Sequence, residues 1–319
     1  MSNPAERDRA ISVLLDTDIG TDVDDALALA VCLGSPEIDL LGITTVYGDV
    51  LLRARMAQKL LALHGVADVA VVSGEERPLS DRRARYWGGH EGVGLLGPAD
   101  EHLAPTGTDA VDFLVRQVRA RPKTVELIAI GPLTNVARAI ARDRSFSADL
   151  AGLTIMGGVL RGQEGLHLPI VEHNFACDPE AAQVVFDSGA PISLVPLDVT
   201  TKVAIGAEEV ARLRRSPTAF HRALAELVCH DPRYRVAHRA YLHDPLAVAV
   251  LIRPELVVWH DLHVTVELGG EQTAGQSLFR LPSAKRPANA RVALGVDVRA
   301  AEAFLAARLN ALIAAPTAP

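Results

Sequence analysis

The chain carries five aspartates within ten residues, at positions 16, 18, 22, 24 and 25. The run follows the apolar segment 11–15 and precedes the segment 26–33, which is rich in residues that favour helices. This order predicts a buried strand, then the acidic run, then a helix. Open α/β sheets bind ligands beyond the carboxyl ends of their strands, so the run occupies a position typical of a binding site.

Carboxylates this close together repel one another, and burying them without a counter-charge costs free energy. Helix capping does not explain the run, because one or two acidic residues are enough to cap a helix. A hard divalent cation with oxygen ligands does explain it. We therefore predict a metal site at this strand-to-helix turn.

The rest of the chain alternates between strand-like and helix-like segments. Apolar runs that predict further strands occupy residues 40–46, 69–72, 125–130, 153–156 and 192–195. Helical patterns occupy residues 51–64 and 109–119 and begin again at Pro132 and Pro179. This alternation predicts the α/β class, with a mostly parallel, mixed central sheet flanked by helices in a Rossmann-like core. Residues 256–268 predict an edge or antiparallel strand, and residues 298–312 predict a closing helix.

The bulk properties limit the domain organisation and the kinds of partner. No linker rich in proline, glycine or serine divides the chain, so we expect a single domain over residues 1–319. The net charge of −7 argues against a nucleic-acid-binding surface, which is normally basic. No apolar run approaches the ~20 residues that a membrane span needs, and residues 1–9 lack the apolar core of a signal peptide. We therefore expect a cytoplasmic protein that binds neither nucleic acid nor membrane.

Further polar clusters follow the predicted strands or lie in long loops. They include Asp49, the segments 131–135 and 172–174, the pair His243-Asp244, and His90 in the long loop 73–105. Taken alone, most of these clusters are explained as well by a capped turn or a helix start. In a parallel sheet, however, the carboxyl ends of the strands meet at one edge, so distant residues can converge on the acidic run.

The order and spacing of these motifs resemble the nucleoside hydrolase family, in particular its inosine-uridine preferring type. The resemblance spans nearly the whole chain. Its motifs are Asp16-Thr17-Asp18 with Asp24-Asp25, Thr44 to Asp49, Gly131 to Asn135, Met156-Gly157-Gly158, Glu172-His173-Asn174, Asp178 to Ala182 and His243-Asp244-Pro245. The resemblance implies a Ca²⁺-dependent enzyme that hydrolyses the N-glycosidic bond of a small-molecule ribonucleoside. It also implies a homodimer or homotetramer.

The resemblance implies roles for individual residues as well. The catalytic residues would be Asp18, which takes the proton from the attacking water, and His243, which protonates the leaving base. The Ca²⁺ ligands would be Asp18, Asp25, Asp244 and the main-chain carbonyl of Ile130. The residues that bind the ribose hydroxyls would be Asp24, Asp49, Glu172 and Asn174, with Asp16 as a support behind the site. This set suits an oxocarbenium-like reaction, because carboxylates near the sugar favour its positive charge.

Some positions depart from the better-known members of the family. The segment between Asp18 and Asp24 is longer and adds Asp22, whose role the sequence leaves open, and Asp49 replaces an Asn. Tyr234 and His238 are four residues apart on a predicted helix, so they share one face. They are candidates for the wall of the base pocket, although a packed helix face explains them as well. The sequence does not distinguish purine from pyrimidine ribosides.

Two other classes stay open on the sequence alone. A strand followed by an Asp-x-Asp pair, here Leu14 to Asp18, also begins phosphatases of the haloacid-dehalogenase type, in which Asp16 would be the nucleophile. That interpretation leaves the motifs at 172–174 and 243–244 without a role. A Ca²⁺-dependent nucleoside-binding protein without catalysis would keep most of the same residues.

Overall fold

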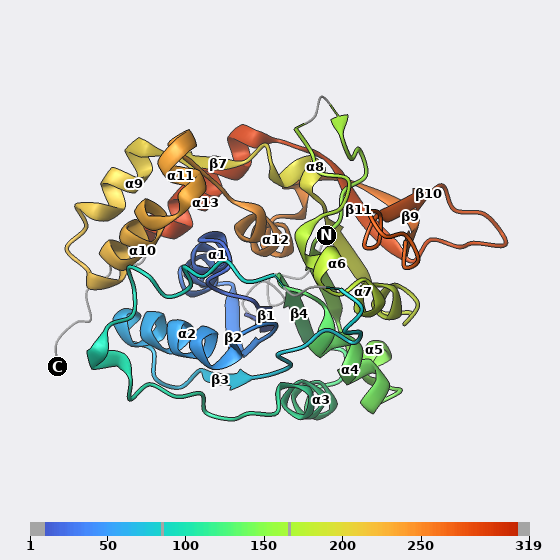
Figure 1. Cartoon of the computed structure of the whole chain (residues 1–319), viewed down its shortest axis with the longest axis horizontal. Coiled ribbons are helices and arrows are strands. Elements are labelled where there is room, and N and C mark those ends of the chain that lie inside the picture. Colours follow the sequence, from blue (N-terminus) through green and yellow to red (C-terminus); the bar gives the residue numbers. More distant parts are fainter. Residues whose placement is uncertain (1–9, 84–85, 165–166, 312–319) are drawn as a thin grey trace, which may run out of the picture.

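The computed structural model describes residues 10–83, 86–164 and 167–311, and a sheet of nine strands forms its centre (Figure 1). The strands are β1 (Ile11–Thr17), β2 (Ile38–Thr45), β3 (Ala70–Ser73), β4 (Val125–Ala129), β5 (Gly152–Met156), β6 (Ile192–Val195), β9 (Val257–Val266), β10 (Ser277–Arg280) and β11 (Ala290–Val296). Their order across the sheet is β10-β9-β11-β6-β5-β4-β1-β2-β3. Val13, Leu14 and Leu15 in β1 are fully buried, as in a parallel strand that is covered on both faces.

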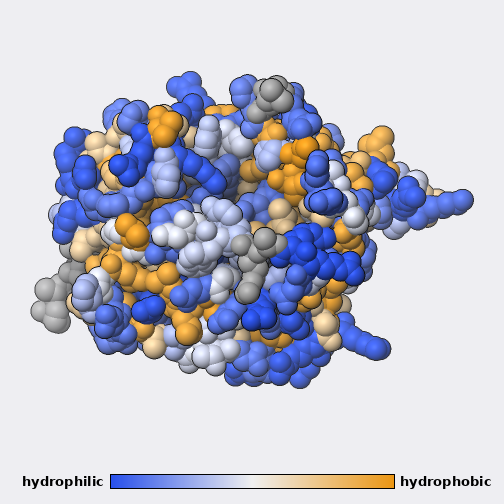
Figure 2. All heavy atoms as spheres, in the orientation of Figure 1, coloured by the Kyte–Doolittle hydropathy of each residue, from blue (hydrophilic) through white to orange (hydrophobic). Residues whose placement is uncertain are grey.

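The strand directions confirm the predicted α/β class with a mostly parallel, mixed sheet. All neighbours from β3 to β11 are parallel, whereas β9 is antiparallel to β11 and β10 is antiparallel to β9. The strand predicted at 256–268 is β9, which is antiparallel and has β10 along its outer edge. Residues 281–288, after β10, are exposed and form a projection whose tip is hydrophilic (Figure 2).

Helices cover both faces of the sheet. They are α1 (Asp24–Leu33), α2 (Val50–His64), α3 (Ala110–Ala120), α4 (Thr134–Arg142), α5 (Phe146–Asp149), α6 (His173–Cys177), α7 (Pro179–Phe186), α8 (Leu197–Thr200), α9 (Ala207–Arg214), α10 (Ala219–His230), α11 (Pro232–Ala237), α12 (His243–Ile252) and α13 (Val298–Asn310). One apolar core includes residues of α1, α2, α10, α12 and α13, and a second includes residues of α3, α4 and α7. A two-stranded ribbon pairs β7 (Ala204–Gly206) with β8 (Arg239–Tyr241). In the described part of the chain, no helix is both long enough and apolar enough to cross a membrane.

Helices α1 and α12 pack against each other and position the candidate site. Both are buried along most of their length, which is typical of helices that are apolar all round. Helix α1 follows β1 and therefore begins at the carboxyl edge of the sheet. The backbone N–H of Asp244 at the start of α12 donates to the carboxylate of Asp24 at the start of α1. The first turns of the two helices are thus side by side, and both carry acidic residues.

Candidate active site

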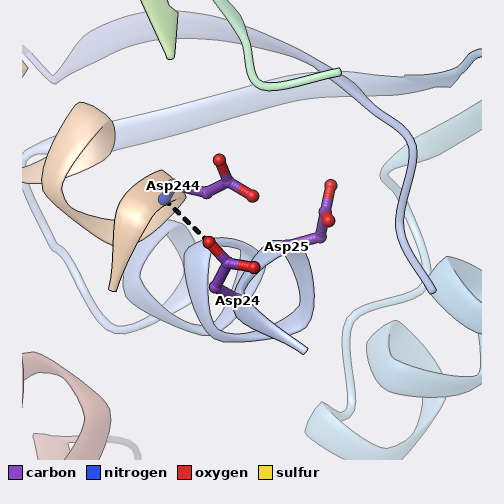
Figure 3. Close-up of side chains that lie close together, drawn as sticks. All are labelled: Asp24, Asp25 and Asp244. Atoms are coloured by element: carbon purple, nitrogen blue, oxygen red, sulfur yellow. Dashed lines mark hydrogen bonds between the residues drawn. The ribbon is translucent and has the colours of Figure 1, made fainter. Parts of the chain in front are cut away.

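Three carboxylates from the first turns of α1 and α12 lie close together (Figure 3). Asp24, Asp25 and Asp244 are buried, and each offers an oxygen that is within 4.8 Å of those of the other two. The backbone N–H of Asp244 donates to Oδ2 of Asp24 at 3.2 Å, which joins the two helix ends. Free N–H groups at helix N-termini favour negative charge, so the fold places the acidic side chains where the backbone tolerates them best.

Burial makes this cluster costly when no cation accompanies it. Burial and repulsion from nearby carboxylates together raise the pKa of Asp24 to about 8 and raise the pKa values of Asp25 and Asp244 well above their usual range. The repelling charge is Asp22 for Asp24, whereas Asp24 is among the charges that repel Asp25 and Asp244. A divalent cation with oxygen ligands would remove both penalties. The three residues therefore form an acidic cluster that fits a hard metal ion, at the place where the acidic run predicted one.

Asp18 is on the turn between β1 and α1 and lines the same cavity as the cluster. The Thr21 hydroxyl donates to its Oδ2 at 2.8 Å, and Nη2 of Arg53 is 4.0 Å from the same oxygen. Arg53 comes from α2, is 1% exposed and also donates to the backbone carbonyls of Asp18 and Ile19. This guanidinium therefore fixes the turn and places a positive charge beside its carboxylate.

Asp16 is behind the cavity rather than in its lining. Its Oδ1 accepts hydrogen bonds from the Thr44 hydroxyl at 2.5 Å and from Nδ2 of Asn135 at 2.7 Å. These bonds connect β1 to β2 and to the start of α4. Burial raises the pKa of Asp16 to about 7. Asp16 is therefore placed behind the site, which is compatible with the supporting role that the resemblance implies for it.

The segment around α6 forms a second side of the cavity. Glu172 caps α6, because its carboxylate accepts from the N–H groups of Asn174 at 2.7 Å and Phe175 at 3.1 Å. It also accepts from the N–H of Gly158 at 2.9 Å. Nδ2 of Asn174 donates to the carbonyl oxygen of Ile130 at 2.9 Å. Ile130, Glu172 and Asn174 therefore meet at the cavity, as the sequence motifs predict for the sugar and metal sites.

The cavity has a volume of about 540 Å³, which is within the range of small-molecule sites. Its remaining wall includes His243, Tyr241 and Arg233. Nδ1 of His243 is 2.8 Å from the Thr200 hydroxyl. Burial, together with the charge of Arg233, lowers the pKa of the His243 imidazole to about 3, so the ring is neutral at pH 7. Nη1 of Arg233 donates to Oδ2 of Asp22 at 2.6 Å.

Two residues that the sequence proposed for the site contact other parts of the molecule. Asp49 is exposed, and its carboxylate caps α2 by accepting from the N–H of Leu52 at 2.8 Å. Nε2 of His90 is 3.1 Å from the carbonyl oxygen of Thr21. His90 lines a smaller neighbouring cavity, which Asp22 also lines. Neither side chain lines the cavity that holds the acidic cluster.

The two candidates for the base pocket on α11 also lie outside this cavity. Tyr234 is 9% exposed and belongs to the apolar core, while His238 is exposed and ends α11 in a left-handed backbone conformation. Their rings contact each other edge to face, with ring centroids 6.2 Å apart. The residue of α11 that lines the cavity is Arg233, next to Tyr234 in the sequence. The structure therefore packs Tyr234 in the apolar core and leaves His238 exposed just beyond the end of α11, so neither forms a wall of this cavity.

Comparison with known proteins identifies the family. Residues 13–303 match the sequence model described as inosine-uridine preferring nucleoside hydrolase. The chain belongs to this family. This nucleoside hydrolase is 34% identical over 295 residues to the pyrimidine-specific ribonucleoside hydrolase RihA of Shewanella sp. (strain MR-7), an alignment that covers 89% of this chain and 92% of that protein. It is 32% identical over 267 residues to uridine nucleosidase 1 of Arabidopsis thaliana, with 81% of this chain and 79% of the relative covered.

A solved structure of the family has the same fold. The purine-preferring ribonucleoside hydrolase from Gardnerella vaginalis matches with a TM-score of 0.85 at 30% identity and covers 94% of this chain and 98% of its own. The chain is therefore a nucleoside N-ribohydrolase, an enzyme that hydrolyses ribonucleosides. This assignment sets aside the phosphatase and the non-catalytic binding protein that the sequence left open. The named relatives differ in the base that they prefer, so they do not decide between purine and pyrimidine ribosides.

The sequence analysis missed two charged residues at the site of this nucleoside hydrolase. Arg53 had a detectable signal, because it shares the buried face of a predicted helix with Val50, Ala54 and Ala57. A buried arginine on an apolar face needs an acidic or carbonyl partner, and the acidic run is the obvious one. Arg233 had a weaker signal: the additional carboxylate of Asp22 required a counter-charge, but no local pattern indicates which arginine supplies it.

Proposed function

We propose that this nucleoside hydrolase is Ca²⁺-dependent and cleaves the N-glycosidic bond in the cavity that Asp18, Asp25 and Asp244 line. The observation that carries this proposal is the convergence of buried carboxylates from a strand end and two helix N-termini on one cavity. The metal ligands would be those three carboxylates and the Ile130 carbonyl. Bound Ca²⁺ would supply Lewis-acid activation of a water and oxygen coordination for the ribose hydroxyls.

Asp18 is the proposed general base. It lines the cavity, and its carboxylate is oriented by Thr21 and Arg53. A base in this position takes the proton of the attacking water as the bond to C1′ forms. If the water attacks C1′ from the face opposite the nucleobase, the configuration at C1′ is inverted.

Asp24, Glu172 and Asn174 are the proposed residues that hold the ribose. All three line the cavity, and Glu172 and Asn174 are fixed by hydrogen bonds to the backbone. Negative charge on this side stabilises the oxocarbenium-like state, in which positive charge develops on the sugar. His243 is the proposed donor to the leaving base. Because its Nδ1 contacts Thr200, Nε2 is the nitrogen available to a ligand, and it would donate a hydrogen bond from a neutral ring.

A direct assay tests this function. The purified protein is incubated with a panel of purine and pyrimidine ribonucleosides, and free ribose is measured in the presence of Ca²⁺ and after chelation. We expect ribose release with Ca²⁺ and a large loss of activity after chelation. Activity that survives thorough chelation would refute the metal assignment, and the absence of ribose from every nucleoside would refute the reaction. Location in the cytoplasm, a single catalytic domain and assembly into a homodimer or homotetramer stay predictions from the sequence.

A further inference from the structure

Residues of both charges line the cavity. The acidic residues are Asp18, Asp22, Asp24, Asp25, Glu172 and Asp244. Among the described residues that line the cavity, Arg233 is the only arginine or lysine. Its charge is permanent at any pH that the protein tolerates, because a guanidinium does not deprotonate. A ligand in this cavity therefore meets both carboxylates and one fixed cation.

Asp22 orients this cation. Nη1 of Arg233 donates to Oδ2 of Asp22 at 2.6 Å, across 211 positions of sequence. In the described part of the chain the guanidinium makes no other hydrogen bond, so most of its N–H donors are available to a ligand. The Arg233 side chain is 62% exposed, and ion pairs at such sites contribute little to stability. The contact therefore adds little to the stability of the fold, and its main effect is to hold the guanidinium at the cavity.

The reaction creates a need for a cation at this wall. When the bond between C1′ and the base breaks, its electron pair moves to the base nitrogen, while positive charge develops on the ribose. Carboxylates suit the sugar end, and a donor-only guanidinium suits the carbonyl oxygens and ring nitrogens of the departing base. The cavity thus offers charges of both signs, as a transition state with charges of both signs requires.

We propose that Arg233, oriented by Asp22, stabilises the negative charge of the leaving base. The inference rests on the proposed function, hydrolysis of the N-glycosidic bond in this cavity. In this step the water oxygen forms the new bond to C1′, and the proton of the water goes to Asp18. The base leaves as an anion that accepts hydrogen bonds from Arg233 and from the neutral ring of His243. Solvent then protonates the base, and Asp18 releases its proton to solvent. Arg233 keeps its own protons throughout, so the overall products are the neutral base and ribose.

The test compares substrates whose leaving groups need different degrees of stabilisation of their negative charge. Uridine and inosine release nitrogen anions, whereas p-nitrophenyl ribofuranoside releases a phenolate that is stable without assistance. We expect Arg233→Met to lower kcat for both nucleosides by about 10²–10³-fold, the usual effect of removing one donor to a developing anion. For the aryl riboside we expect a change of less than about 5-fold, because the charge needs little stabilisation there.

Two further variants and a control define the role. Arg233→Lys keeps the charge and should recover part of the kcat for nucleosides. Asp22→Asn keeps Arg233 but weakens the contact that orients it. The loss of kcat should therefore depend on the leaving group in the same way and should be smaller than the loss in Arg233→Met. Arg235→Met changes the same residue type on the same helix, at an exposed position outside the cavity, and should behave like the wild type.

Other results would overturn the proposal. Equal losses of kcat on nucleosides and on the aryl riboside would show that Arg233 acts on the sugar or on the fold. A raised KM with unchanged kcat would show that it contributes to ground-state binding alone. If Arg233→Met does not fold, the same comparison is made with Arg233→Lys. If the wild type hydrolyses neither kind of substrate, the proposed function itself fails, which is distinguishable from an error about Arg233.

Discussion

Replacing Asp244 by asparagine should stabilise the metal-free protein and reduce the stabilisation that Ca²⁺ provides. Asp244 shares the acidic cluster with Asp24 and Asp25, and its pKa is raised by burial and by both neighbours. No hydrogen bond to its carboxylate is formed within the described residues, so an amide of the same shape loses no partner. The substitution therefore removes one charge and little else.

The magnitude follows from the geometry. Two unit charges 4.8 Å apart repel by about 3.5 kcal/mol at an effective dielectric constant of about 20. Two such neighbours would make full ionisation of Asp244 cost about 7 kcal/mol. Proton uptake limits this cost, because keeping a carboxyl protonated above its ordinary pKa costs about 1.4 kcal/mol per pH unit, or about 4 kcal/mol at pH 7. The metal-free variant should therefore be more stable than the wild type by at most about 4 kcal/mol at pH 7.

The direction of the pH dependence follows from the raised pKa of Asp244. A carboxyl whose pKa is higher in the folded than in the unfolded state binds more protons when folded. Its contribution therefore makes the protein less stable as the pH rises above the unfolded value of about 4. The gain from Asp244→Asn should be close to zero near pH 4 and should grow toward neutral pH.

Thermal unfolding followed by circular dichroism measures these differences. In chelator at pH 7 the melting temperature of Asp244→Asn should exceed that of the wild type by up to about 8 °C, at about 2 °C per kcal/mol for a large domain. At 100 times its dissociation constant, Ca²⁺ should stabilise the wild type by about 2.7 kcal/mol and the variant by much less. Asp68→Asn, the same change at an exposed position, is the control. A metal-free variant that is less stable than the wild type at pH 7, or an equal response of both proteins to Ca²⁺, would refute the reasoning.

Three further predictions test the site. Asp18→Asn should lower kcat by about 10²–10⁴-fold, the usual contribution of a general base, while Ca²⁺ still raises the melting temperature through the remaining ligands; full activity would contradict the base assignment. Arg53→Met should destabilise the protein by about 3–5 kcal/mol in denaturant unfolding, because it leaves buried carbonyls without a donor and Asp18 without its counter-charge, whereas Arg55→Met, on the same helix, should have little effect. Asp49→Ala should cost about 1 kcal/mol of stability through the lost cap of α2 and leave kcat/KM unchanged; a raised KM for nucleosides would instead support a contact with the sugar.

The α/β fold was predictable because its signals are local. Apolar runs of strand length alternate with helical patterns, and each pattern can be recognised from the residues of its own segment. The acidic run was predictive for the same reason: its five carboxylates are adjacent in sequence, and their repulsion demands a cation or protons in any fold that buries them. The motifs around Ile130, Glu172 and Asn174 were assigned to the site by their resemblance to the nucleoside hydrolase family. The convergence of strand ends on one edge of a parallel sheet made that assignment possible but did not require it.

Side-chain partners across the fold were decided by packing alone. Asp244 meets Asp24 across 220 positions because α12 packs on α1, and Asp22 meets Arg233 because α11 begins beside the acidic turn. Tyr234 and Arg233 are neighbours in sequence, yet one is in the apolar core and the other lines the cavity. The sequence by itself therefore determined the fold class, the family and the need for a cation. Only the tertiary structure decided which charges face the ligand, because that depends on how the helices are oriented and packed against one another. The local periodicity of the sequence does not contain this information.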